Sequence, residues 1–221
     1  MADWSNEFIK TLKGMSGRYS SYQIFSDWVE SAAISYRNSC HLIHDAEWQR
    51  WEDQYMRIVA RYEHDELCKF GYLIACTAKA LEDEMEDFLG KVFMLAGLGD
   101  SGTGQFFTPF NISMMSAKLL LDEKGIPKEG KIQLHEPTCG AGGMVIAACK
   151  ILHERGFDYQ RRLDVIAQDL DWRGVYMTYL QLSLLGCRAI VCQGNTITDP
   201  YHVGYPRERC METPAWMGLI V

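Results

Sequence analysis

The chain has 221 residues and a formal net charge of −7, which together exclude several classes of function. Its apolar share of 48% and charged share of 23% are typical of a globular protein with a substantial core. A protein that holds duplex DNA unaided usually has a basic face, so any DNA contact must be local or supplied by a partner. No apolar run has the length of a membrane span and no signal-peptide pattern opens the chain, so we expect a cytoplasmic protein without membrane contact.

Cysteine and histidine spacing predicts neither a disulfide framework nor a metal site. Eight cysteines lie at positions 40, 68, 76, 139, 149, 187, 192 and 210, without a CxxC pair, and we expect reduced, mostly buried thiols. His41 and His44 are the nearest to a ligand pair, and their spacing favours a solvated helix face over metal binding. We therefore predict no bound metal.

Residues 1–98 contain no proline and are expected to form an all-helical domain. Apolar and aromatic residues recur at three- and four-residue steps, first at Trp48, Trp51, Tyr55, Ile58, Val59 and Tyr62, then on a further helix at Leu67, Phe70, Ile74, Leu81, Met85, Phe88 and Val92. Such a stripe can stack bases, but it more often forms a core or a subunit interface.

An acidic run accompanies the second part of that pattern. Its members are Glu82, Asp83, Glu84, Glu86 and Asp87. A cluster of carboxylates can bind a metal, but at this spacing a solvated helix face is the favoured interpretation.

A glycine-rich joint at 97–104 separates this helical part from a second domain, predicted over residues 99–221. The run Gly-Gln-Phe-Phe-Thr-Pro at 104–109 follows it. A helix with apolar residues from Ile112 to Leu120 comes next, and either Thr108 or Asn111 is placed to cap it.

Residues 131–144, Lys-Ile-Gln-Leu-His-Glu-Pro-Thr-Cys-Gly-Ala-Gly-Gly-Met, predict a strand, a tight turn and a helix. Glycines at such a turn permit positive φ and let a ligand approach the backbone, and the helix beyond offers unpaired N–H groups. The spacing is neither GxGxxG nor a phosphate loop, so a ligand with a carboxylate fits better than one with a pyrophosphate. A turn that only packs helix on strand remains the alternative.

The remaining pattern is typical of an α/β fold. Residues 163–169 predict a second strand, 175–185 a crossover helix and 189–195 a third strand, and residues 216–221 are a candidate fourth strand. Alternation of this kind implies parallel pairing, with the carboxyl ends of the strands at one edge. Glu136, Asp169 and Asn195-Thr196 then converge there, although Asp169 alone is equally consistent with a turn or helix cap.

Three motifs in this order resemble the N6-adenine DNA methylase family, in particular the modification subunits of type I restriction systems. They are Gly-Gln-Phe-Phe-Thr-Pro at 104–109, Glu-Pro-Thr-Cys-Gly-Ala-Gly-Gly at 136–143 and Gly-Asn-Thr at 194–196. The resemblance covers about residues 87–200. It implies a Rossmann-like core that binds S-adenosylmethionine (SAM), here with about four strands, behind a helical N-terminal domain.

Carried over onto matching positions, the resemblance also implies roles for individual residues. Phe106, Thr108 and Pro109 would line the methionine end of SAM. Glu136, Thr138 and the turn of Gly140, Gly142 and Gly143 would hold the amino acid moiety. Asp169 would bind the ribose, and Asn195 with Thr196 the adenine, although family members often carry aspartate where Asn195 stands.

The family's catalytic motif, (Asn/Asp)-Pro-Pro-(Tyr/Phe), is expected after a fourth strand. Its amide or carboxylate and a proline carbonyl accept hydrogen bonds from the target amino group, and its aromatic ring stacks on the flipped-out base. No Pro-Pro pair occurs in these 221 residues. Asp199-Pro200-Tyr201 lacks the second proline and follows the third strand too closely, so we interpret it as a turn and assign no catalytic residue.

Three functions remain open from sequence. The first is an N6-adenine DNA methyltransferase completed by a partner that supplies DNA recognition, with the helical domain as an oligomer interface. The second is a catalytically inactive SAM-binding protein derived from that family, acting as a regulatory protein or subunit mimic. The third is a methyltransferase for small molecules, RNA or protein that shares only the fold, against which the motif at 104–109 argues.

Overall fold

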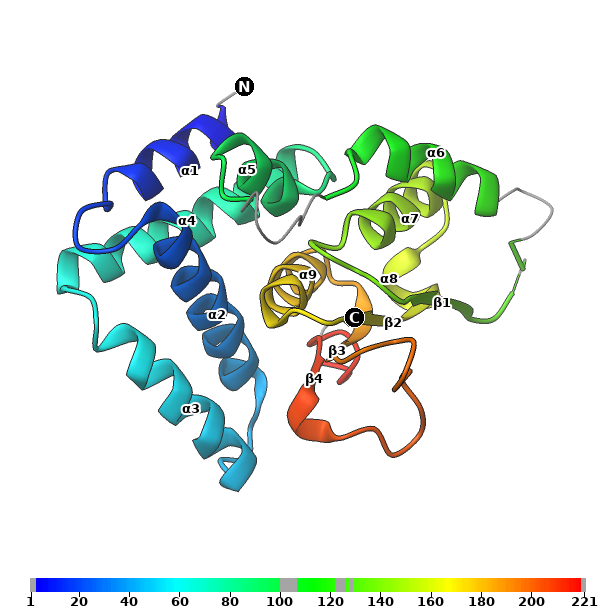
Figure 1. The fold of residues 1–221 in the computed structure, drawn as a ribbon. Coiled ribbons are helices and arrows are strands. Elements are labelled where there is room, and N and C mark those ends of the chain that lie inside the picture. Colours follow the sequence, from blue (N-terminus) through cyan, green and yellow to red (C-terminus); the bar gives the residue numbers. More distant parts are fainter. Residues whose placement is uncertain (1–2, 100–106, 122–125, 128, 220–221) are drawn as a thin grey trace.

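The computed structural model describes residues 3–99, 107–121, 126–127 and 129–219 (Figure 1). In Figure 1 the first helices lie on one side of α9, and the sheet with α6, α7 and α8 extends on the other. The first helices are α1 (Trp4–Lys13), α2 (Ser21–Cys40), α3 (Ala46–Val59), α4 (His64–Asp83) and α5 (Phe88–Leu95).

The second half alternates strands with helices. Its elements are α6 (Phe110–Leu120), β1 (Ile132–Glu136), α7 (Gly143–Glu154), α8 (Tyr159–Arg162), β2 (Leu163–Asp169), α9 (Trp172–Leu184), β3 (Arg188–Gln193), the 3-10 helix η1 (Arg207–Arg209) and β4 (Cys210–Glu212).

Most of the early helices begin where a short polar side chain takes up an unpaired N–H group. Asp3 accepts from Asn6 N–H at α1, Ser20 from Gln23 N–H at α2, and Asp45 from Trp48 N–H at α3. The predicted continuous helix over 67–92 is instead two helices, because Glu84 is extended and Asp87 begins α5 by accepting from Gly90 N–H. The single amphipathic pattern in the sequence is thus divided between α4 and α5 by the N-cap at Asp87.

The predicted caps of α6 are wrong. The helix begins after Pro109, and neither Thr108 nor Asn111 makes a capping hydrogen bond. The backbone carbonyl of Pro109 accepts from Ile112 and Ser113 N–H instead.

One hydrophobic core runs through both halves of the described chain, from Phe8 to Met211. Around Trp28, rings pack edge to face, with Phe8 at 4.9 Å between centroids. The aromatic stripe of α3 also packs inward: Trp51 is buried, 5.8 Å from the ring of Trp172 at the start of α9. The interpretation of this stripe as core is confirmed for Trp51, and the division at residues 98 and 99 stays a prediction.

The sheet has the order β1-β2-β3-β4, and its first three strands are parallel. Apolar residues fill β2, where Val165 and Ala167 are fully buried, as expected for a strand covered on both faces. The register pairs Glu136 with Ala167 and Asp169 with Gln193, so the carboxyl ends of the three strands lie together. The predicted Rossmann-like arrangement is confirmed.

The fourth strand differs from the prediction. It comprises Cys210–Glu212 and pairs antiparallel with β3, while residues 216–219 lie in turns. Three turn hydrogen bonds explain this, from the N–H groups of residues 217, 218 and 219 to the carbonyls of residues 213, 215 and 214. Backbone groups satisfied locally in this way cannot pair with a strand.

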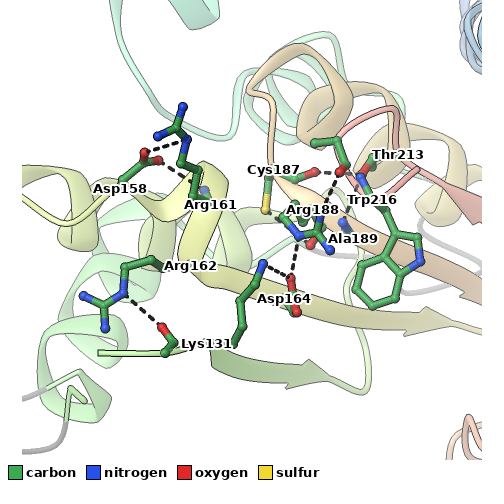
Figure 2. A network of polar contacts seen from close by, with 12 residues as sticks. Lys131, Asp158, Arg161, Arg162, Asp164, Cys187, Arg188, Ala189, Thr213 and Trp216 are labelled. Atoms are coloured by element: carbon green, nitrogen blue, oxygen red, sulfur yellow. Dashed lines mark hydrogen bonds and ion pairs between the residues drawn. The ribbon is translucent and has the colours of Figure 1, made fainter. Parts of the chain in front are cut away.

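An ion-pair network holds the amino ends of the strands (Figure 2). Asp164 Oδ1 accepts from Arg188 Nε at 2.7 Å and from Lys131 Nζ at 3.2 Å. Arg188 also donates to the Ala215 carbonyl, and Thr213 Oγ1 joins the Cys187 carbonyl to the Ala189 N–H. Charges at this end are matched within the protein.

Other sequence predictions have mixed outcomes. All eight cysteines are free thiols and five are buried, as predicted.

His41 and His44 lie in the connection between α2 and α3, not on a helix face, and His44 stacks on Trp48 at 3.9 Å. Within the described residues, no three His, Cys, Asp or Glu side chains gather as a metal site would require, and no helix has the length and apolarity to cross a membrane.

Candidate functional site

A hollow of about 360 Å³ opens beside the carboxyl ends of β1 and β2. Its volume lies in the range of small-molecule sites, roughly 300–1,000 Å³. The described residues that line it are Asp87, Phe107, Thr108, Ser113, Thr138, Cys139, Gly140, Ala141, Gly143, Met144, Asp169 and Leu170. They come from the helical half, from the start of α6, from the glycine turn and from the end of β2.

The turn between β1 and α7 depends on glycine at two positions. Gly140 has φ 53° and Gly142 has φ 98°, the left-handed region that other residues adopt only at a cost. A Cβ at Gly140 would lie 3.0 Å from the ring of Phe107, and one at Gly143 would lie 3.1 Å from Asp87 Oδ2. Side chains at these positions would fill the space between the turn and its neighbours, so the glycines keep it open.

Asp169, the last residue of β2, fastens the turn to the sheet. Its Oδ2 accepts from Gly140 N–H at 2.8 Å, and its Oδ1 accepts from Asp171 N–H at 2.9 Å. Thr178 on α9 donates to the Gly140 carbonyl at 3.0 Å. Each carboxylate oxygen has a second lone-pair direction, so Asp169 is able to accept further hydrogen bonds from a ligand in the hollow.

Asp87 is the wall residue that sequence reasoning missed, because the acidic run was interpreted as a solvated face. It is 5% exposed and lies beneath the hollow, where its Oδ1 accepts from Gly90 N–H and from Gln181 Nε2, both at 2.9 Å. The pattern Asp-x-x-Gly at the start of an apolar run was the available signal, since it is typical of a helix N-cap. Burial raises the pKa of the Asp87 carboxyl.

Gln181, fully buried on α9, connects the helical half to the glycine turn. Its Nε2 also donates to the Ala141 carbonyl at 2.7 Å, and its Oε1 accepts from Leu89 N–H at 3.1 Å. One side chain therefore holds the start of α5, the turn and α9 in fixed positions.

One buried polar atom and one carboxylate oxygen beside the hollow have no hydrogen-bond partner among the described residues. Ser113 Oγ on α6 makes no hydrogen bond, and Asp87 Oδ2 accepts none. The described lining contains two carboxylates, Asp87 and Asp169, but no lysine, arginine or histidine. Unpaired polar groups and unmatched negative charge are costly in an interior, so this wall is suited to a polar ligand that carries positive charge.

Five of the predicted site residues line the hollow: Thr108, Thr138, Gly140, Gly143 and Asp169. Phe106 lies outside the described residues. Gly142 is one step removed and packs against Thr178, and Pro109 begins α6 on an exposed surface.

Glu136, Asn195 and Thr196 instead stabilise the loops around the hollow. Glu136 Oε1 accepts from the N–H of Thr138 at 3.1 Å. Asn195 Oδ1 accepts from the N–H of residues 197 and 198, and Thr196 Oγ1 donates to the Pro137 carbonyl at 2.6 Å. Their predicted contacts with SAM stay predictions.

Asp199, Pro200 and Tyr201 lie in the loop after β3 and none lines the hollow. The Asp199 carboxylate lies 3.6 Å from Arg209, and the Tyr201 ring packs 5.7 Å from that of Tyr205. Backbone groups of Asp199 and Tyr201 bond the side chain of Gln168. The segment is thus a loop that hydrogen bonds tie to β2, and its interpretation as a turn is not confirmed.

Comparison with known proteins assigns the chain to a family. The model of the N-6 DNA methylase family matches residues 81–214, more than half of the chain and all of the hollow's described wall. This chain belongs to the N-6 DNA methylase family. The predicted recognition is thereby confirmed, and the match begins before α5, so it includes Asp87 as well as the sheet.

One relative of the chain is the type I restriction enzyme MjaIX methylase subunit of Methanocaldococcus jannaschii. It is 32% identical over 118 residues, which make up 53% of this chain and 18% of that protein. The chain thus corresponds to less than a fifth of its relative's length.

Among solved structures, a Listeria monocytogenes protein described as a class I SAM-dependent methyltransferase covers 86% of this chain and 53% of its own. The identity is 14% and the TM-score 0.44.

Membership in the N-6 DNA methylase family implies SAM as the cofactor. The residues present fit such a group. SAM carries positive charge on its sulfonium and its ammonium, and the hollow presents two carboxylates, an unpaired serine hydroxyl and a glycine turn without side chains.

Proposed function

We propose that this chain binds SAM in the hollow beside β1 and β2 and serves as the cofactor-binding part of an N6-adenine DNA methyltransferase. The observation that carries the proposal is the hydrogen bond from Gly140 N–H to the Asp169 carboxylate, at 2.8 Å. Both residues line the hollow and lie within the part of the chain that matches the family. Ligands of open α/β sheets bind at the carboxyl ends of the strands, which is where this contact lies.

In this proposal different residues of the chain bind different parts of SAM. Asp169 has lone pairs left for ribose hydroxyls, and the turn from Thr138 to Gly143 lies where backbone can contact the amino acid moiety. SAM, when bound, supplies an electrophilic methyl group. Orientation of that group toward the target nitrogen is the contribution that these residues make to the rate.

DNA contact and base positioning are assigned to a partner. The net charge of −7 disfavours unaided binding to a polyanion, and no Pro-Pro motif stands in these residues to accept the adenine amino group. The relative from M. jannaschii is itself named a subunit. In this proposal residues 1–98 form the domain that contacts other chains, and a second polypeptide carries the (Asn/Asp)-Pro-Pro-(Tyr/Phe) motif or the DNA recognition function.

Isothermal titration calorimetry tests the cofactor step. SAM and S-adenosylhomocysteine should both bind with one-to-one stoichiometry, and ATP, a nucleotide with the wrong charge, should not bind. Absence of binding by both adenosyl ligands to the folded chain would end the proposal.

A second candidate function, a SAM-binding protein without catalysis, is favoured by the missing Pro-Pro motif. Transfer of labelled methyl from SAM to adenine in duplex DNA separates the two. The proposed function predicts transfer when a partner with the motif is added and little without it. Binding of SAM with no transfer in either mixture supports the non-catalytic function.

A further inference from the structure

Asp87 has one carboxylate oxygen more than its structural task requires. Capping of α5 uses Oδ1, which accepts from Gly90 N–H and Gln181 Nε2. Oδ2 accepts no hydrogen bond from any residue that the structure describes, although the side chain is buried. Serine or asparagine would serve equally well as an N-cap, and neither would bury a negative charge.

The free oxygen lies between two glycines and borders the hollow. A Cβ on Gly90 would stand 2.1 Å from Oδ2 and one on Gly143 would stand 3.1 Å from it, so both positions leave the oxygen room. Gly143 is the first residue of α7, whose N-cap, Gly142, supplies no side-chain hydrogen bond. Oδ2 is therefore adjacent to a helix N-terminus with unpaired N–H groups.

A buried carboxylate in this position needs a cation from elsewhere. Burial raises its pKa, and no lysine, arginine or histidine is found along the part of the wall that the structure describes. The hydrogen bonds from Gln181 hold the carboxylate in place before any ligand arrives, which limits the ordering cost of binding.

We propose that Asp87 binds the α-ammonium of the methionine moiety of SAM, which makes the helical half of the chain part of the cofactor site. This rests on the proposed function. An α-amino acid carries its ammonium and carboxylate on one carbon, so it needs an anionic acceptor and N–H donors close together. Asp87 Oδ2 and the start of α7 supply this pair, whereas the Glu136 carboxylate accepts from its own turn.

The arrangement makes the presence of the amino acid part a condition of tight binding. The adenosine part contacts the sheet side, near Asp169, and does not reach the oxygen beneath α7 in this proposal. A nucleoside without the amino acid therefore gains nothing from Asp87.

Calorimetry on the full chain tests the assignment with Asp87→Asn, which keeps the size of the side chain. Three probes are titrated: SAM, S-adenosylhomocysteine, which lacks the sulfonium charge, and 5′-methylthioadenosine, which lacks the amino acid. We expect Asp87→Asn to lower the affinity for SAM and for S-adenosylhomocysteine at least tenfold each and to leave the affinity for methylthioadenosine unchanged. Glu82→Gln removes an exposed charge from the same acidic run and should alter none of the three.

Each other outcome overturns the assignment. Weaker binding of SAM but not of S-adenosylhomocysteine would place the carboxylate at the sulfonium. An equal loss of affinity for all three probes would mean that the substitution distorts the hollow. Unchanged affinities would show that Oδ2 touches no ligand. If the wild-type chain binds none of the probes, the proposed function fails before Asp87 is tested.

A measurement on the wild-type chain covers the case in which Asp87→Asn does not fold. An S-adenosylhomocysteine analogue that lacks only the α-amino group should bind at least tenfold more weakly than S-adenosylhomocysteine itself. Equal affinities would contradict the proposal without any variant.

Discussion

The two ends of the parallel sheet are built in opposite ways. At the amino end, Asp164 is matched by Arg188 and Lys131 within the protein (Figure 2). At the carboxyl end, Asp87 and Asp169 border a hollow whose described wall offers no cation. Unmatched buried charge lowers stability unless a ligand compensates it, so this contrast supports the proposal that the ligand binds at the carboxyl end.

The largest effect is expected from Gln181→Leu, which removes the side chain that joins both halves at the carboxyl end. It leaves the Leu89 N–H, the Ala141 carbonyl and Asp87 without their buried partner. We expect a loss of about 3 kcal/mol in the free energy of unfolding. Urea denaturation measures it, with Gln133→Leu on the exposed face of β1 as control. A loss no larger than in the control would mean that the halves are not joined through Gln181.

Removal of the Asp169 carboxylate, which we propose binds the ribose, tests the carboxyl end directly. Asp169→Ala should weaken SAM binding by roughly tenfold to a hundredfold, the value of a hydrogen bond to a charged group. Asp164→Ala deletes a carboxylate from the same strand at the other end and should leave the affinity unchanged. Equal effects of the two substitutions in calorimetry would refute the distinction between the ends.

Backbone strain at the glycine turn gives a smaller effect. Gly142→Ala puts a Cβ at φ 98°, 3.2 Å from Thr178 Oγ1, and should cost about 1–2 kcal/mol of stability. Gly71→Ala is the matched control, because Gly71 lies within α4 with open space around it. Alanine there should stabilise the protein by up to about 1 kcal/mol, so the two variants should shift the melting temperature in opposite directions.

The smallest effect is expected at the amino end. Asp164→Asn weakens ion pairs that are partly exposed to solvent, and such pairs contribute below about 1 kcal/mol each. The loss should shrink further at high salt, which screens them. A stability change of several kcal/mol that is insensitive to salt would show that this network is not a surface feature.

Much of the site region follows from local sequence. The alternation in β2 and its ending at Asp169, the glycine turn and the helix after it were all predicted within one or two residues, because period and turn chemistry are local properties. Parallel strands then bring their carboxyl ends together by topology alone, which is why Gly140 and Asp169 meet as expected.

Tertiary structure decided the remainder. Sequence period cannot tell a buried carboxylate from a solvated one, so Asp87 was assigned to an exposed face until the packing of α5 against α9 and the turn enclosed it. Pairing of Cys210–Glu212 with β3 likewise depends on backbone groups far apart in the chain. Sequence by itself determined the first three strands, the glycine turn and the motifs of the N-6 DNA methylase family. Only the fold decided which charges are left without a partner, because desolvation depends on all the neighbours at once.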